Sequence, residues 1–466
     1  MKSEWFSLLR MASYLATILA FLIVRVGQAE SFEPVLSLCS LFSGVVSVFA
    51  AGRFARMMGI FFVGLGTWFV WRAGIGIMDY VLLYGDMIFM LALFALAPLL
   101  ALPVKLGGYG ESIRELLVNR IKSLQQMYRL VTSISFLLGT FLNVATLPLM
   151  YPITKLLAGS FKVTNEKRFV NISILHGYAL PIMLTPVSGV VGVVVETTGV
   201  RWLELLPYLL FYCLAGLVLS WIMFSLRIPS LNPFELGAPE LAMQEHKPEK
   251  DANAVHVRKL LHIITAILLL VVIVLITDHF LSAGLAGSVA LAAFPFALVW
   301  ALLVSRGRSF LRDTGNYFRV QLPKMSELFV VFVAAGFFLR ALQYSGMDAV
   351  FNNGIVQWIE WVGTSGLLLS IPLLIIALSF IGVNPVITIT LLAGSLRPDL
   401  FDVSLVGVAV ACLGGAMITF LVGPYSGSLG LMSTLSGAST YRISGWCAAQ
   451  AAALYALLGI TVVMIG

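Results

Sequence analysis

The sequence predicts an all-α polytopic membrane protein with about eleven transmembrane helices and two re-entrant hairpins, arranged as two repeats of inverted topology. Three observations support this prediction. The 466 residues are 60% hydrophobic and 11% charged, with a mean hydropathy of +0.99, whereas about a quarter of the residues in soluble domains are charged. Apolar runs of roughly 20 residues, enough to cross a hydrocarbon core about 30 Å thick, recur along the whole chain. Several motifs also recur about 240 residues apart, as shown below by residue number.

The distribution of charge indicates orientation in a membrane. The net charge is +7, but the Lys and Arg residues lie in short loops between apolar spans and form no continuous basic stripe. They therefore predict membrane topology and give no reason to expect a nucleic-acid partner. The four cysteines are scattered and lack the C-x-x-C spacing of a metal or redox site, so we interpret them as packing residues and expect no covalent cofactor.

The amino-terminal segment, residues 1–30, has a basic start, an apolar stretch and small residues near Gly27. These features are also found in cleaved signal peptides. Arg10 and Arg25 interrupt the apolar stretch, and its length approaches that of a full span. We therefore expect a retained first helix, with a cleaved signal peptide as the alternative.

Two repeats are expected to follow, residues 31–226 and 259–466, joined by a polar cytoplasmic linker at 227–258. The linker has charges of both signs and four prolines. The expected spans are Ser7–Gly27, Pro34–Gly52, Met57–Met78, Asp86–Leu102, Phe169–Val200, Trp202–Leu226, Leu260–His279, Leu281–Val304, Ser326–Leu342, Val403–Ser436 and Ile443–Ile465.

The positive-inside rule assigns the basic loops to the cytoplasm. This places the amino terminus inside the cell and the carboxyl terminus outside, in the plasma membrane. The basic residues that set this orientation are Arg53, Arg56, Lys105, Arg114, Arg120, Lys122, Arg129, Lys162, Lys167, Arg168, Arg306, Arg308, Arg312, Arg319 and Lys324.

Two further apolar stretches, Leu130–Leu157 and Leu367–Leu396, do not fit a single crossing. Basic residues flank the first stretch on both sides, and one crossing would place them on opposite faces of the membrane. A re-entrant hairpin removes this conflict, with arms that each rise about 20 Å at 1.5 Å per residue. Irregular backbone at such a depth must be buried in protein or line a wet cavity, so its turn is a candidate site. A single long helix is the alternative.

The repeat is visible in paired motifs. Asn143, in FLNVAT, has a counterpart in Asn384, in IGVNPVIT, and Pro186 has one in Pro424, each about 240 residues later. The stretch Gly107–Arg120 carries two arginines and has Lys105 and Lys122 beside it, whereas Gly346–Trp361 carries acidic residues and no Lys or Arg. Opposite charge in equivalent stretches is expected if the two repeats insert with opposite orientation.

The sequences LTPVSGV and LVGPYSGS place proline, glycine and serine within two spans. Proline removes a backbone donor and glycine favours departure from helical geometry, so both helices should unwind there. The freed carbonyls of Leu184 or Val422 would join hydroxyl groups in oxygen arrays suited to a small cation, and the half-helix amino termini would favour an anion. The hydroxyls concerned are those of Thr185, Ser188, Ser426 and Ser428. A proline kink satisfied by its neighbours is the alternative.

These two hairpin tips and two proline-broken helices resemble the divalent anion:sodium symporter family of the ion transporter superfamily, over nearly the whole chain. The resemblance implies an elevator-type symporter with Na⁺ as the coupling ion. The tips differ from the family's Ser-Asn-Thr pattern, which puts dicarboxylate specificity in question. The implied ion ligands are Asn143, Thr185, Ser188, Gly189, Asn384, Ser426 and Gly427, and the implied substrate residues are Asn143, Thr146, Pro186, Asn384, Thr388 and Pro424.

The predicted function is therefore cation-coupled symport of a small organic anion by a protein that is not an enzyme. Membrane lipid is its other expected partner, and a homodimer is one assembly that we consider. A proton-coupled antiporter or exporter is the main alternative, with Asp86 and His176 as candidate proton carriers. A membrane-embedded enzyme would need clustered acidic or histidine residues at a membrane face, and a channel would need a filter signature; we find neither pattern.

Overall fold

The computed structural model describes residues 2–161, 163, 165–227, 250–281, 283–395 and 403–465. Its elements are α-helices and short 3₁₀ turns, and no strand occurs among these residues. Eleven of the described helical stretches are long and apolar enough to cross a membrane. The chain is thus an all-α polytopic membrane protein, as its composition predicts.

The eleven stretches differ from the eleven expected spans in two places. Helix α2 (Glu33–Val48) has 16 residues, and the expected span Phe169–Val200 is divided into helices of 13 and 10 residues, so neither reaches spanning length. The first expected hairpin is counted instead, as 124–160, and so is 348–380, which joins the amphipathic stretch to the first arm of the second expected hairpin. The number agrees because the two stretches gained offset the two expected spans lost, one of which is too short and the other broken.

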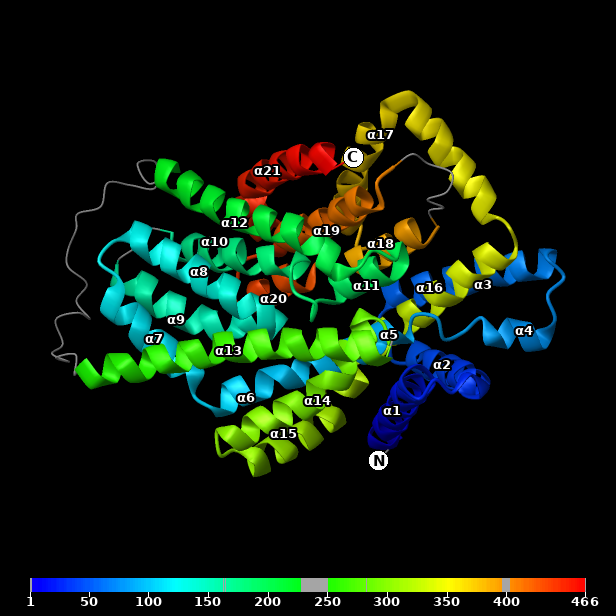
Figure 1. Ribbon diagram of the computed structural model, residues 1–466, viewed down its shortest axis with the longest axis horizontal. Helices are drawn as coiled ribbons and strands as arrows, with labels where there is room; N and C mark the ends of the chain where they lie inside the picture. Colours follow the sequence, from blue (N-terminus) through cyan, green and yellow to red (C-terminus); the bar gives the residue numbers. More distant parts are fainter. Residues whose placement is uncertain are drawn as a thin grey trace.

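The first half of the chain forms helices α1 to α12 (Figure 1). Helix α10 ends at Tyr178 and α11 begins at Gly189, so the break falls where the proline motif predicts it. The bounds are α1 Lys2–Val26, α2 Glu33–Val48, α3 Arg53–Arg72, α4 Ile77–Leu82, α5 Ile88–Leu96, α6 Ala101–Leu106, α7 Tyr109–Arg120, α8 Leu124–Leu142, α9 Thr146–Ser160, α10 Glu166–Tyr178, α11 Gly189–Thr198 and α12 Trp202–Arg227.

The second half forms helices α13 to α21 (Figure 1). Helix α17 is bent at Gly363, whose φ of 74° lies in the left-handed region that favours glycine. The bounds are α13 Lys250–Leu281, α14 Leu285–Leu303, α15 Gly307–Val320, α16 Ser326–Tyr344, α17 Asp348–Phe380, α18 Pro385–Ser395, α19 Leu405–Val422, α20 Gly427–Ser436 and α21 Thr440–Ile465.

The element order of the second half repeats that of the first at a constant offset along the chain. Helices α11 and α20 each have 10 residues, α12 and α21 each have 26, and the two pairs begin at the same offset. Gly199 and Gly437, separated by that offset as well, end α11 and α20 with φ of 70° and 66°. Gly108 and Gly346 precede the two amphipathic segments with φ of 65° and 71°. The repeat seen in short motifs therefore extends to helix lengths and to the glycines at helix ends.

The tightest helix crossings are repeated as well. Gly177 of α10 meets the backbone of Thr132 of α8, with no room for a side chain between them. Gly415 of α19, which lies at the equivalent position of the second half, meets Pro372 of α17 in the same way. Small residues allow backbones to approach closely where no hydrophobic effect drives helices together in lipid. In each half, the first arm of the predicted hairpin is thus tightly packed on the first part of the broken helix.

The two halves are interleaved. Helix α11 packs on α18 and α19, and helix α20 packs on α9 and α10. Helices α8 and α9 lie side by side and are joined at a turn, as a hairpin requires (Figure 1). We call α8, Asn143–Ala145 and α9 the first hairpin, and the part of α17 after Gly363 with α18 the second hairpin. Helices α1 to α3, α5, α13, α14 and α16 pack outside these units, and we call them the scaffold.

Three expectations about loops need correction or restriction. The stretch around Arg312, expected to be a basic loop, is helix α15, which buries Phe310 and Thr314 and exposes its arginines. The linker is shorter than expected because α13 begins at Lys250; its residues 228–249 lie outside the described residues. Lys162 and residues 396–402, which begin with Leu396 at the end of the expected second hairpin, also lie outside them.

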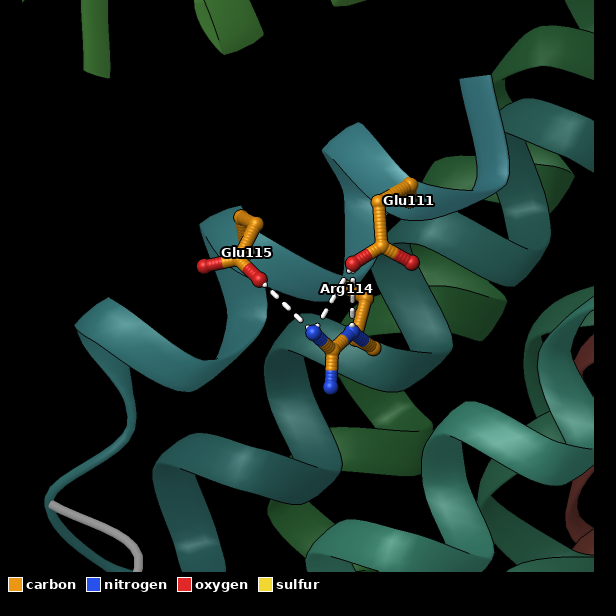
Figure 2. Close-up of polar contacts among 3 residues, drawn as sticks. All are labelled: Glu111, Arg114 and Glu115. Carbon is orange, nitrogen blue, oxygen red and sulfur yellow. Dashed lines mark hydrogen bonds and ion pairs between the residues drawn. The ribbon is translucent and has the colours of Figure 1, made fainter. Parts of the chain in front are cut away.

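The amphipathic helix α7 is less basic in effect than its arginines suggest. Figure 2 shows Arg114 between Glu111 and Glu115, with ion-pair distances of 2.8 and 2.9 Å. The hydrogen bond that Arg114 donates to Glu111 is the main cause of a raised pKa of its guanidinium. Arg114 is therefore neutralised within its own helix. Lys105, Lys122 and Arg129 remain as the basic residues around it that support a cytoplasmic location.

Candidate functional site

The turn of the first hairpin is formed by Asn143. Helix α8 ends at Leu142, and Asn143 adopts φ 47° and ψ −127° before α9 begins at Thr146. A positive φ is uncommon for a residue with a side chain, and strained backbone is found preferentially at functional sites. Asn143 is half-buried, and its carboxamide oxygen accepts a hydrogen bond from the Tyr178 hydroxyl at 3.4 Å. The structure thus places this asparagine at the hairpin tip, beside the end of α10.

The break between α10 and α11 adjoins this tip directly. The Thr185 hydroxyl donates to the backbone carbonyl of Thr140 at 2.6 Å, and Thr185 and Pro186 are buried. Ser188 is the N-cap residue of α11, and Gly189 is its first residue. Ser188 is buried, and a Cβ on Gly189 would meet the ring of Phe94. Three residues predicted for the first ion site, Thr185, Ser188 and Gly189, thus lie in this buried break, which contacts the hairpin that carries Asn143.

The turn of the second hairpin has a different local structure. It runs from Ile381 to Asn384, and the positive φ of 97° falls on Gly382. The Asn384 carboxamide oxygen accepts a hydrogen bond from the backbone N–H of Val386 at 2.9 Å. This is the geometry of an N-cap, here followed by Pro385 at the first position of α18. Asn384 therefore has a structural role that Asn143 does not share.

The break between α19 and α20 also adjoins its own hairpin, because Gly423 lies against the Ser379 hydroxyl. Ser426 is buried and caps α20 through the backbone N–H of Leu429 at 3.4 Å, and its hydroxyl is 3.2 Å from that of Ser428. Gly427 is exposed, with open space beside its Cα among the described residues. This second break is thus more accessible than the first, although both are built in the same way.

The freed carbonyls that we expected to face a cation are already hydrogen-bonded. Trp202 Nε1 donates to the carbonyl of Leu184 at 3.0 Å, and the Ser444 hydroxyl donates to the carbonyl of Val422 at 2.6 Å. A carbonyl oxygen has two lone pairs, so each retains one for a further ligand. The donors come from α12 and α21, so neither carbonyl offers both of its lone pairs to a cation.

Two hydroxyl groups near the tips have no hydrogen-bond partner among the residues that the structure describes. Thr146 and Thr388 are both buried, and the Oγ1 atom of each is unpaired within that part of the chain. Buried polar atoms are usually paired in native proteins, so both hydroxyls have capacity for a further partner. Ser135 and Thr154 of the first hairpin share this property, so it does not by itself mark the tips. Thr146 begins α9 directly after the first tip. Thr388 lines an apolar groove between α18 and the scaffold.

The two candidate proton carriers are each engaged with a neighbour. Asp86 forms an ion pair with Arg340 of α16, with oxygen–nitrogen distances of 2.9 Å. His176 Nδ1 is 2.6 Å from the Tyr128 hydroxyl. Among the residues that the structure describes, no three His, Cys, Asp or Glu side chains form a group that could hold a metal ion. A cation at the described tips would therefore be bound by hydroxyl, amide and carbonyl oxygens.

Sequence reasoning missed several residues that connect tips and breaks. The hairpin residues that contact the breaks are Thr140 and Ser379, and they are separated by nearly the repeat offset. In the first half, Tyr178 also contacts Asn143. The repeat offset between Thr140 and Ser379 could have identified this pair from the sequence. Tyr178 and Trp202 could not have been found, because their roles depend on how α10 and α12 pack on the break.

No protein-family model matches the chain, and no curated protein matches it by sequence. The fold is similar to that in a crystal structure of the Alcanivorax borkumensis YdaH transporter, which is described as having an unusual topology. The TM-score is 0.56 at 16% sequence identity, over 80% of this chain and 85% of that one. At this identity the likeness concerns the fold. It does not single out the divalent anion:sodium symporter family.

Proposed function

We propose that the protein is a secondary active transporter in which the two hairpin tips and the two helix breaks form a single binding region. The observation that carries this proposal is the duplicated contact between tip and break. Thr185 binds the backbone of the first hairpin, and Gly423 lies against Ser379 of the second. Broken helices that meet at a repeat interface are typical of secondary transporters. The similar fold of a protein described as a transporter supports the same class.

Within this class we propose sodium-coupled symport of a small organic anion. The tips and breaks offer neutral oxygen atoms, which are suitable ligands for a hard monovalent cation. The amino termini of α11 and α20 begin directly after the breaks, where backbone N–H groups and the helix dipole favour an anion. We further propose that the hairpins and broken helices move together against the scaffold, in the elevator manner.

A proton-coupled antiporter or exporter is the second candidate. It is favoured by the hydrogen bonds to the carbonyls of Leu184 and Val422, which leave fewer free oxygens for sodium than the sequence suggests. The candidates differ in their response to cations. Sodium should stabilise the purified protein in the first case, and only pH should matter in the second.

A thermal-shift screen of the purified full-length chain against small organic anions tests the proposal. Each anion is tested in sodium, potassium and choline chloride at equal ionic strength. We expect an anion that raises the melting temperature more in sodium than in the other salts, and that anion should then be accumulated by proteoliposomes with a sodium gradient. Equal shifts in all three salts, with uptake driven by a pH gradient, would favour the second candidate.

A further inference from the structure

An apolar groove lies beside the contact of the second hairpin with the scaffold. It has a volume of about 580 Å³ and is lined by residues of α3, α16, α17 and α18. Thr388 is the single polar residue among the described residues that line it. Val350 and Leu374, which also line it, are 62% and 43% exposed, so the groove opens onto the outer surface of the protein.

The groove lies within the hydrocarbon region of the membrane. Along α3 it extends from Met58 to Phe69, and this helix has Arg53 and Arg72 at its two ends. The 20 residues of α3 rise about 30 Å at 1.5 Å per residue, which matches the thickness of the hydrocarbon core. The open side of the groove is therefore expected to face lipid.

A positive charge lies about one helical turn beyond the last groove-lining residue of α3. Arg72 is three residues after Phe69 and thus on the same side of α3. It is exposed, its guanidinium carbon lies 5.3 Å from the centroid of the Trp68 ring, and it has no acidic partner among the residues that the structure describes. Trp71 beside it is 76% exposed. Arginine and tryptophan together are typical of the membrane–water interface.

We propose that this groove binds one anionic glycerophospholipid. Its phosphate lies at Arg72 and an acyl chain runs along α3 toward Met58. The helix rises about 21 Å between these two positions, which equals half of the roughly 40–45 Å thickness of a bilayer with its headgroups. Both the charge and the length of the site therefore match a single lipid of one leaflet.

The bound chain would lie where the second hairpin has to move. Val383 of the hairpin tip lines the groove, and the neighbouring Gly382 lies against the ring of Phe54 at the start of α3. A lipid in the groove lies between α18 and α3 along this path. Occupancy of the groove by lipid therefore regulates the movement of the second hairpin. This regulatory role rests on the proposed elevator movement. The lipid-binding site does not depend on that movement.

Native mass spectrometry of the full-length protein tests the site. The detergent-purified protein is titrated with phosphatidylglycerol or phosphatidylcholine. We expect the wild type to retain phosphatidylglycerol in preference to phosphatidylcholine. Arg72→Gln should weaken phosphatidylglycerol binding about fivefold, the factor that corresponds to roughly 1 kcal/mol per basic residue near a membrane surface. Val350→Trp, at the exposed rim, should reduce binding of both lipids by filling the groove.

The matched controls are Arg53→Gln, at the opposite end of α3, and Leu373→Trp, which is 51% exposed on α17 and does not line the groove. Both should bind lipid like the wild type. Equal binding of the two lipids by the wild type, or equal losses in the test and control variants, would overturn the proposal. Lipid binding is measured without substrate, so its failure would leave the transport proposal unaffected.

Discussion

The glycines at the two tight crossings are the residues at which a single methyl group should have the largest effect. A Cβ on Gly177 would overlap the backbone of Thr132, and one on Gly415 would overlap Pro372. Backbone cannot move aside as a flexible side chain can, and overpacking typically costs about 1–3 kcal/mol. We therefore expect Gly177→Ala and Gly415→Ala each to lower the melting temperature of the purified protein.

Gly445→Ala is the matched control for these variants. Gly445 also lies within a helix, α21, but it has open space beside it among the described residues. Alanine favours helix more than glycine by about 1 kcal/mol, so this change should be neutral or stabilising. Equal melting temperatures of all three variants would show that the packing of the two halves does not depend on the close crossings.

The two tip asparagines should respond differently to substitution, because their local roles differ. Asn143→Gly removes the amide but keeps a residue that tolerates positive φ, so the fold should persist while stabilisation by sodium is lost. Asn384→Ala also removes the cap of α18, which should cost about 1 kcal/mol in addition. Asn384→Asp keeps the cap and separates the two effects. The measurement is the sodium-dependent shift in melting temperature of each variant.

Unchanged sodium dependence in both Asn143→Gly and Asn384→Asp would mean that the asparagines are only structural. The tips would then need another cation ligand. In the first hairpin, the hydroxyl of Thr146, which is unpaired among the described residues, is the nearest candidate.

At the scale of the helical elements, the first hairpin makes a prediction about access. If α8 and α9 enter and leave the membrane on one side, Lys122 and Gly159 both face the cytoplasm. Both residues are exposed, and Gly159 has no close neighbour among the described residues, so cysteine is tolerated at either position. In a variant without the four native cysteines, neither Lys122→Cys nor Gly159→Cys should react with an impermeant thiol reagent in intact cells. Both should react after permeabilisation. Reaction of only one in intact cells would establish a true crossing.

The elements that could be predicted from sequence were those with strong local signals. The breaks at Pro186 and Pro424 and the tips at Asn143 and Asn384 lie where the motifs place them. Helix α15 was missed because its charges were interpreted only as a topology signal, although its buried face, with Phe310 and Thr314, has helical spacing. The donors to the freed carbonyls were missed for another reason. They come from α12 and α21, and no local pattern reveals which helices pack beside a break.

At the scale of the whole molecule, the repeat is recognisable in sequence through a few residues and in structure through helix lengths, caps and crossings. The fold class could be predicted because composition and span length are direct consequences of the bilayer. The interleaving of α11 with α18, and of α20 with α9, could not, because it depends on contacts between the two halves of the chain. The central claim is that the two halves insert in opposite orientations.

Oriented vesicles test this claim most directly. A cleavage sequence for a site-specific protease is inserted after Gly108 in one variant and after Gly346 in another. These two glycines occupy equivalent positions of the repeat, and each precedes the amphipathic segment of its half with a positive φ. With protease added outside, the insertion after Gly108 should be cut in inside-out vesicles and protected in right-side-out vesicles, and the insertion after Gly346 should show the reverse. Cleavage of both insertions from the same side of the membrane would contradict the account.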